Sequence, residues 1–305
     1  MTVQVVAFGG NALLPDPLDP SSQGARALAG ALSLVNPAGE GMVLVHGNGP
    51  QVGMILLRIE ATRDRIPPEP LDVLVAETQG SIGYLLARTI RSSPLPGTQE
   101  VAAVMTQVLV DSLDPAFSHP TKPVGPYYTG EEAIRLEEVC GWDMAAVPRG
   151  WRRTVPSPRP REVVEIRTIR EAATSGTIVI AGGGGGVPVI RGRDGELLGA
   201  EAVVDKDLTA SLIAVSLEAR RLVIITEVDA VYRDFGGESP EPVHILRHDE
   251  AARLLESGEL PPGSMGPKVE GALLFSISTG REALITDLDH LDEALNHRAG
   301  TWVLP

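Results

Sequence analysis

The fold is decided by VQVVAFGGN (residues 3–11) and MVLVHGNG (residues 42–49), two apolar runs that each end in a glycine turn. Each run has the length of a buried β-strand, and its glycines let the backbone turn sharply into a helix. Such a unit points N–H groups and a helix N-terminus at an anion, so the pair predicts two anionic groups held face to face. Neither turn carries the lysine of a GxxxxGK[ST] phosphate loop, and the neutralising charge must come from elsewhere.

Further apolar runs of strand length recur at residues 101–110, 177–181, 222–226 and 283–286. Helical patterns mostly separate them, and the clearest follows Pro70, where apolar side chains recur at three- and four-residue steps. Alternating strands and helices are typical of parallel strands joined by crossover helices, which predicts an α/β fold. The other predicted helices cover residues 24–35, 52–62, 166–174, 208–220, 249–256 and 269–278.

Length and charge limit the class of protein. The 305 residues allow one large α/β domain or two smaller ones, and a net charge of −14 argues against a nucleic-acid partner. The single cysteine, Cys140, excludes an intrachain disulfide and favours a reducing compartment, so we expect a cytoplasmic protein. No apolar run is long enough to span a bilayer, and we expect no membrane partner.

Two stretches break the alternation. Residues 111–161 are rich in proline, which removes backbone donors, and they surround one short acidic helix at residues 131–138. We interpret this stretch as a protruding insertion or lid. Residues 182–195 begin with five glycines and predict a hairpin that lies against another backbone.

Three lysines stand in unusual segments. Lys206 (in VVDKD) and Lys268 (in PGSMGPK) begin predicted helices, where a cation opposes the helix dipole unless an anion is also present. Either a ligand or neighbouring carboxylates supply that anion, and Asp207 is a candidate N-cap. Lys122, on the predicted lid, has two open interpretations, a ligand contact and an ordinary solvated lysine.

Structural interpretations of the other polar residues also stay open. Asn11 and Asn48 suit the backbone of a glycine turn, and His46 ends a strand with no visible partner. Residues 226–229 (TEVD) follow a strand at its carboxyl end, where open α/β sheets bind ligands. A basic cluster, for which a solvated loop is the simplest interpretation, comprises Arg149, Arg152 and Arg153.

Several catalytic motifs are absent from the sequence. Without HExxH, CxxC or GxSxG, zinc proteolysis and α/β-hydrolase chemistry have little support, and we predict no metal-ligating side chains. In GNGPQVG (residues 47–53) the last glycine comes one residue too late for the GxGxxG dinucleotide pattern, so a Rossmann oxidoreductase is a weak alternative.

Nine segments, in order along most of the chain, resemble the carbamate kinases of the amino acid kinase family. In related kinases a lysine stands two residues before the first glycines, whereas here that position is Ala7, as in carbamate kinases. The segments are AFGGNALL (7–14), HGNGPQVG (46–53), ETQGSIGY (77–84), TKPVGPYY (121–128), RGWRRTVPSPRP (149–160), GGGGGVPV (182–189), AVVDKDLTA (202–210), TEVDAVY (226–232) and GSMGPK (263–268).

This resemblance implies a three-layer αβα sandwich with a mainly parallel central sheet over residues 1–305, with a lid subdomain inserted at residues 112–161. It also implies a homodimer. The implied reaction is reversible phosphoryl transfer between MgATP and carbamate, run physiologically from carbamoyl phosphate and ADP toward ATP, with Mg²⁺ bound to the nucleotide. Arginine, agmatine and purine breakdown all stay open as the source of carbamoyl phosphate.

The resemblance also implies roles for individual residues. Lys206 and Lys268 would contact the moving phosphoryl group, Asp207 would orient them, and Lys122 would reach in from the lid. The implied binding residues are Gly9, Gly10 and Asn11 for the phosphoryl group, Gly47, Asn48 and Gly49 for carbamate, and Thr226, Val228 and Asp229 for the nucleotide.

Two other functions stay open at this point. One is a different small-molecule kinase of the same fold, against which Ala7 argues. The other is a nucleotide-binding sensor without catalysis, against which the intact lysines argue.

Overall fold

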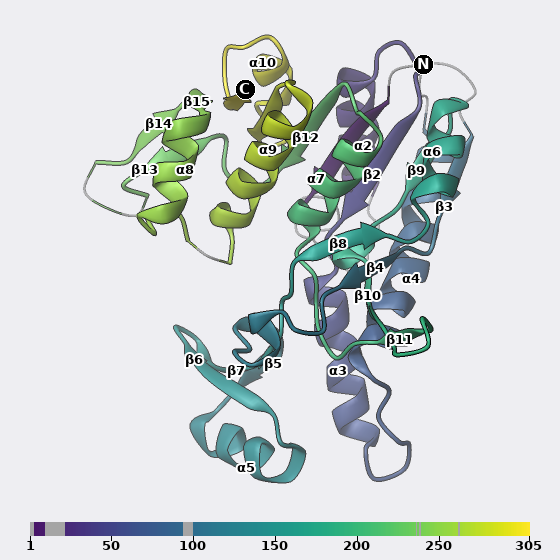
Figure 1. Ribbon diagram of the computed structural model, residues 1–305, viewed down its shortest axis with the longest axis vertical. Helices are drawn as coiled ribbons and strands as arrows, with labels where there is room; N and C mark the ends of the chain where they lie inside the picture. Colours follow the sequence, from purple (N-terminus) through teal and green to yellow (C-terminus); the bar gives the residue numbers. More distant parts are fainter. Residues whose placement is uncertain (1–2, 10–21, 94–99, 236, 238, 262) are drawn as a thin grey trace.

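The computed structural model describes residues 3–9, 22–93, 100–235, 237, 239–261 and 263–305 (Figure 1). Within these residues an eight-stranded sheet forms the centre, in the order β15-β17-β16-β12-β1-β2-β9-β3. Its neighbouring strands run parallel except for the pair β16 and β17. In chain order the strands are β1 (Gln4–Phe8), β2 (Met42–His46), β3 (Val101–Ala103), β9 (Ile178–Ile180), β12 (Arg221–Ile225), β15 (Ile245–Arg247), β16 (Ala283–Thr286) and β17 (Thr301–Leu304).

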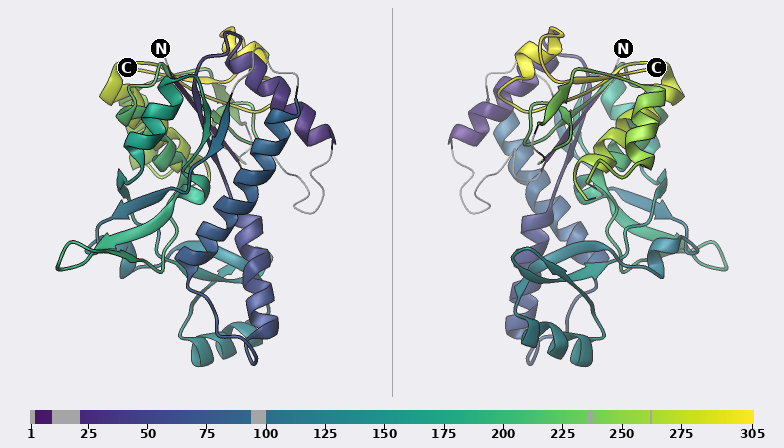
Figure 2. Two further views of the ribbon diagram at one scale, coloured as in Figure 1. Left: turned by 90° about the vertical axis from the view of Figure 1, so that its right-hand side faces the viewer. Right: turned by 90° about the vertical axis from the view of Figure 1, so that its left-hand side faces the viewer.

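Helices cover both faces of this sheet, which confirms the predicted α/β sandwich (Figure 2). Because successive side chains of a strand point to opposite faces, Val5 and Ala7 of β1 pack in one apolar core while Val6 and Phe8 pack in the other. The first core is covered by α6 (Ile166–Thr174), α7 (Lys206–Ser216), α8 (His248–Glu256) and α9 (Met265–Thr279), and the second by α2 (Ser22–Val35), α4 (Leu71–Arg91) and α10 (Leu291–Leu295).

The apolar run at residues 101–110 forms two strands in different sheets, so its prediction as one strand is wrong. After β3 the chain leaves the central sheet, and at this break the side chain of Gln79 in α4 holds both the N–H and the carbonyl of Thr106. The Thr106 N–H donates to Gln79 Oε1 at 2.7 Å, and Gln79 Nε2 donates to the Thr106 carbonyl at 3.0 Å. The run continues as β4 (Gln107–Val110) in a second sheet.

This second sheet has the order β11-β10-β4-β8 and contains the predicted hairpin. β10 and β11 pair antiparallel, and the glycine run before them forms the short helix η2 (Gly183–Gly185). The remaining strands are β8 (Pro160–Val163), β10 (Val187–Arg191) and β11 (Leu197–Gly199).

A three-stranded sheet with the order β5-β7-β6 and the helix α5 lie together at one end of the molecule (Figure 1). Pro126 of β5 lies where the pairing with β7 is irregular, between Val124 and Tyr128, and Gly125 there has φ +74°. Buried apolar side chains of α3 (Gly49–Thr62), α4, β5 and β7 join this group to the rest of the protein. Its elements, with the short helix before them, are η1 (Pro115–Phe117), β5 (Lys122–Tyr128), α5 (Gly130–Cys140), β6 (Asp143–Val147) and β7 (Gly150–Val155).

Several strands near the C-terminus are not predicted by the sequence pattern. β13 (Val231–Arg233), β14 (Glu241–Val243) and β15 have three residues each, too few to show a periodicity. β17 was missed as well, and it is the strand that reverses the sheet direction beside β16.

Gly41, directly before β2, offers a test of how the helical layer packs on the sheet. A Cβ at Gly41 would lie 1.6 Å from the carbonyl oxygen of Ala173 in α6, a backbone atom that cannot rotate away. We expect Gly41→Ala to lower the free energy of unfolding by about 2–3 kcal/mol in urea denaturation. Gly30→Ala is the control, because nothing lies within 4 Å of its Cβ position in α2, and it should gain up to about 1 kcal/mol of helix propensity. Equal effects of the two substitutions would contradict this packing.

Candidate active site

The carboxyl ends of three central strands meet at one edge of the sheet. Phe8 of β1 is in register with His46 of β2 and Ile225 of β12, so the residues that follow lie side by side. The Gly9 N–H donates to the Ile225 carbonyl at 3.0 Å, and the Gly47 N–H donates to the Phe8 carbonyl at 3.1 Å. The expectation that these two N–H groups are free to bind an anion is therefore wrong. Gly10 and Asn11 lie outside the described residues.

The second glycine turn fixes the side chain of Asn48. Asn48 is the N-cap residue of α3, and its Nδ2 donates to Thr78 Oγ1 of α4 at 2.9 Å. The glycine run packs on the other side: a Cβ at Gly184, whose φ is +66°, would lie 2.1 Å from Asn48 Nδ2. Glycine is therefore required at this position, and Asn48 is held between two elements.

The DKD segment brings two predicted lysines together around one buried carboxylate. Asp207 has a side chain only 3 % exposed; it pairs with Lys206 through Oδ1 and with Lys268 Nζ through Oδ2 at 3.2 Å. Lys268 also donates to the Ser264 carbonyl at 3.0 Å. A buried carboxylate is costly unless it is paired, so Asp207 keeps both ammonium groups close to it.

Asp205 is the N-cap of α7, so the prediction of Asp207 as N-cap is wrong. Its side chain accepts a 2.9 Å hydrogen bond from the Asp207 N–H, the bond that starts the helix at Lys206. Its other oxygen pairs with Lys122 Nζ at 2.9 Å. Burial alone would raise the pKa of Asp205, but the charges of Lys122 and Lys206 hold it below its usual range. Asp205 was not predicted as a site residue, although an aspartate directly before the first residue of a helix is a typical N-cap.

Lys122 is not an ordinary solvated lysine, because its side chain is 28 % exposed and paired with Asp205. It lies at the start of β5 and extends into a cleft between the three-stranded sheet β5-β7-β6 and the carboxyl end of the central sheet. The cleft thus contains every lysine of the chain, since the sequence has three. Among the described residues, its polar side chains are those of Asn48, Lys122, Arg152, Asp205, Lys206, Asp207 and Lys268, and the glycines that line it are Gly47, Gly49, Gly184 and Gly263.

A second pocket adjoins this cleft at Lys268, which lines both. Thr226 and Val228 line it together with apolar side chains such as Tyr232 and Met265. Asp229 is not among its lining residues; it accepts a hydrogen bond from the Tyr232 hydroxyl at 2.9 Å. Two ligands bound in the cleft and the pocket would therefore meet at Lys268.

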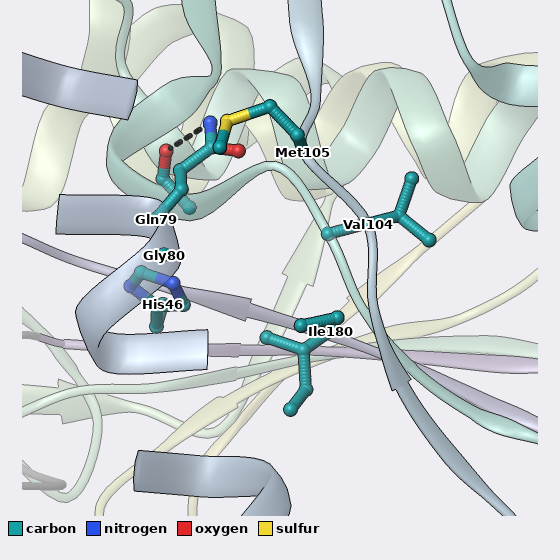
Figure 3. A pocket seen from close by; sticks show the side chains of 9 residues that line it. His46, Gln79, Gly80, Val104, Met105 and Ile180 are labelled. Carbon is teal, nitrogen blue, oxygen red and sulfur yellow. Dashed lines mark hydrogen bonds between the residues drawn. The ribbon is translucent and has the colours of Figure 1, made fainter. Parts of the chain in front are cut away.

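His46 lies behind the second glycine turn, in a small pocket that it shares with Gln79 and Gly183 (Figure 3). Gln79 Nε2 donates to the Gly183 carbonyl at 3.0 Å, which fixes the glycine run on α4. His46 Nδ1 is 3.0 Å from the Gly47 carbonyl, to which the neutral ring donates. Burial lowers the pKa of His46 to about 4, so the ring stays neutral and supports the turn.

Among the described residues no three His, Cys, Asp or Glu side chains form a group that could hold a metal ion. In the same part of the chain no helix is long and apolar enough to cross a membrane.

The fold and the cleft together define a small-molecule kinase scaffold, and the chain belongs to the amino acid kinase family, whose sequence profile matches residues 2–287. Carbamate kinases are among its full-length relatives in that family. The enzyme from Pyrococcus horikoshii is 41% identical over 310 residues, covering 99% of this chain and 98% of that protein. The one from Haemophilus influenzae is 40% identical over 303 residues, covering 98% and 96%. The solved structure of carbamate kinase from Giardia lamblia bound to AMP-PNP superimposes with a TM-score of 0.86, at 35% identity, covering 99% and 98%.

The buried His46 predicts a specific pH dependence of stability. Its pKa is about 4 in the folded protein and 6.5 in the unfolded chain, so the unfolded chain alone gains a proton as the pH falls between these values. The unfolding free energy should therefore decrease with falling pH, by about 2 kcal/mol from this group between about pH 7.5 and pH 5. His46→Gln lacks this titration and should show a shallower slope in denaturant titrations. An imidazole NMR titration with a midpoint near 6.5 would contradict a neutral His46.

Proposed function

We propose that this protein is a carbamate kinase, which transfers a phosphoryl group reversibly between carbamoyl phosphate and ADP. The observation that carries the proposal is the Lys206–Asp207–Lys268 group at the junction of the cleft and the adjoining pocket. The full-length carbamate kinase relatives agree with this reaction.

The geometry supports direct, in-line transfer. With the nucleotide in the pocket of Thr226 and Val228 and carbamoyl phosphate in the cleft, the bond from phosphorus to the carbamoyl oxygen breaks as a terminal oxygen of ADP bonds to phosphorus. Such a transfer depends on alignment and on charge stabilisation at the equatorial oxygens, and it needs no covalent nucleophile. Lys206 and Lys268 supply positive charge to these oxygens, and Asp207 keeps their ammonium groups in place.

Other residues of the chain bind the two substrates in this proposal. The turn at Gly47, Asn48 and Gly49 holds the carbamate group, with Asn48 fixed by Thr78. Residues 112–161 act as a lid, from which Lys122 reaches the substrate. Gly10 and Asn11 remain predicted phosphoryl ligands from the first turn, and Asp229 a predicted nucleotide ligand that acts beside Tyr232.

Mg²⁺ fits this site as a partner of the nucleotide. Because the described residues offer no group of three acidic or histidine ligands, the ion would be held chiefly by phosphate oxygens and water, as is usual for Mg²⁺ in kinases. When bound, it neutralises charge on the phosphates. Net flow toward ATP, a cytoplasmic location and a homodimer complete the proposal.

The direct test of this function is ATP formation from carbamoyl phosphate and MgADP, followed by a coupled assay. We expect turnover that depends on both substrates. Absence of ATP would overturn the proposal, and a substrate panel with a better phosphoryl acceptor than carbamate would favour another kinase of this family.

Lys206→Ala tests the role of the lysine beside the moving phosphoryl group. If Lys206 stabilises charge mainly in the transition state, kcat should fall on the order of 10²-fold or more, with a smaller effect on ADP binding. Steady-state kinetics and calorimetric ADP titration measure the two effects. An unchanged kcat would remove Lys206 from the mechanism.

Lys122→Ala tests the proposed lid. The loss of this charge should raise the KM for carbamoyl phosphate about 10-fold or more, because one charge-assisted contact is lost. Lys122→Arg keeps the charge and should restore part of the affinity. Unaltered KM and kcat in Lys122→Ala would show that this lysine only anchors Asp205.

A further inference from the structure

Arg152, on strand β7 of the lid sheet, lines the same cleft as Lys122 and the turn at residues 47–49. The sequence suggests no more than a solvated loop for this residue and its neighbours. In the structure its side chain is half-buried and lines the cleft.

The guanidinium of Arg152 is held in a fixed orientation. Its Nε and Nη2 donate to the Gly125 carbonyl at 3.2 and 2.8 Å, and its central carbon lies 5.3 Å from the centre of the Tyr127 ring. Gly125 packs on the first turns of α3, because a Cβ at Gly53 would lie 3.7 Å from the Gly125 carbonyl carbon. Arg152 is therefore fixed beside the turn that begins α3, at the carbamate end of the cleft.

The charges in the cleft show why this arginine differs from the lysines. Lys122 is paired with Asp205, and Lys206 and Lys268 share Asp207. Arg152 contacts a neutral carbonyl and an aromatic ring, and no carboxylate of the described chain forms an ion pair with it. Among the described residues, four cationic and two anionic side chains line the cleft, and their formal charges sum to +2.

We propose that Arg152 binds the planar carbamoyl end of the substrate. A guanidinium presents parallel N–H donors that match a carboxylate-like group, and one without a carboxylate partner loses no ion pair when it binds an anion. The lysines at the other end of the cleft remain for the phosphoryl group. This inference rests on the proposed function and adds a residue that recognises the carbamoyl group.

The test compares Arg152→Met with Arg149→Met. Arg149 belongs to the same lid and lies 4.9 Å from the same Tyr127 ring, but it is exposed and does not line the cleft. Arg152→Met should raise the KM for carbamoyl phosphate about 10-fold or more and leave the KM for ADP within about twofold, because a charge-assisted contact to one substrate is lost. Arg149→Met should leave both values within about twofold. Arg152→Lys keeps the charge and should recover part of the affinity.

The melting temperature of each variant shows whether a change in KM comes from weaker binding or from a loss of folding. An unchanged KM for carbamoyl phosphate in Arg152→Met would overturn the inference, and so would equal rises in both KM values. A similar effect of Arg149→Met, or no recovery in Arg152→Lys, would show that Arg152 only clamps Gly125. If the unmodified protein forms no ATP, the proposed function fails; if it turns over normally and Arg152→Met binds equally well, this inference alone fails.

Discussion

The buried carboxylate of Asp207 is the constraint on which the rest of the site depends. Its side chain is 3 % exposed, and a charge so far from water is stable only when oppositely charged groups surround it. Lys206 comes from the adjacent residue and Lys268 from α9, so one carboxylate joins two helices that are far apart in sequence. The ion group thus links the packing of α7 on α9 to the chemistry at their N-termini.

Parallel strands explain why such distant segments meet. β1, β2 and β12 are adjacent and in register, so their carboxyl ends bring residues 9, 47 and 226 to one edge of the sheet. Asp205 then connects this edge to β5, because one carboxylate both starts α7 and holds Lys122. The same side chain serves the local helix and the long-range contact.

Local patterns predicted most helices and the strands that precede both glycine turns. Apolar periodicity and the turns made by glycine are set within a few neighbouring residues, so the sequence shows them directly. The break at Thr106 depends on Gln79, which is distant in sequence, and no local pattern reveals it. The three-residue strands were missed for lack of length, and the free N–H groups expected at Gly9 and Gly47 are used by neighbouring strands. The sequence pointed to the cleft lysines, because they stand in unusual segments. Arg152 did not stand out from the other arginines, because its partner is a backbone carbonyl.

The restriction of lysine to the cleft has a practical consequence. Of 26 lysine and arginine residues three are lysines, and all three line one cleft. Every ε-amino group of the chain is therefore part of the proposed substrate site, while the remaining basic surface consists of guanidinium groups that amine reagents do not modify. Succinimide esters, cyanate or an aldehyde-activated support would therefore modify residues of the cleft. Dyes and matrices are better attached through the thiol of Cys140.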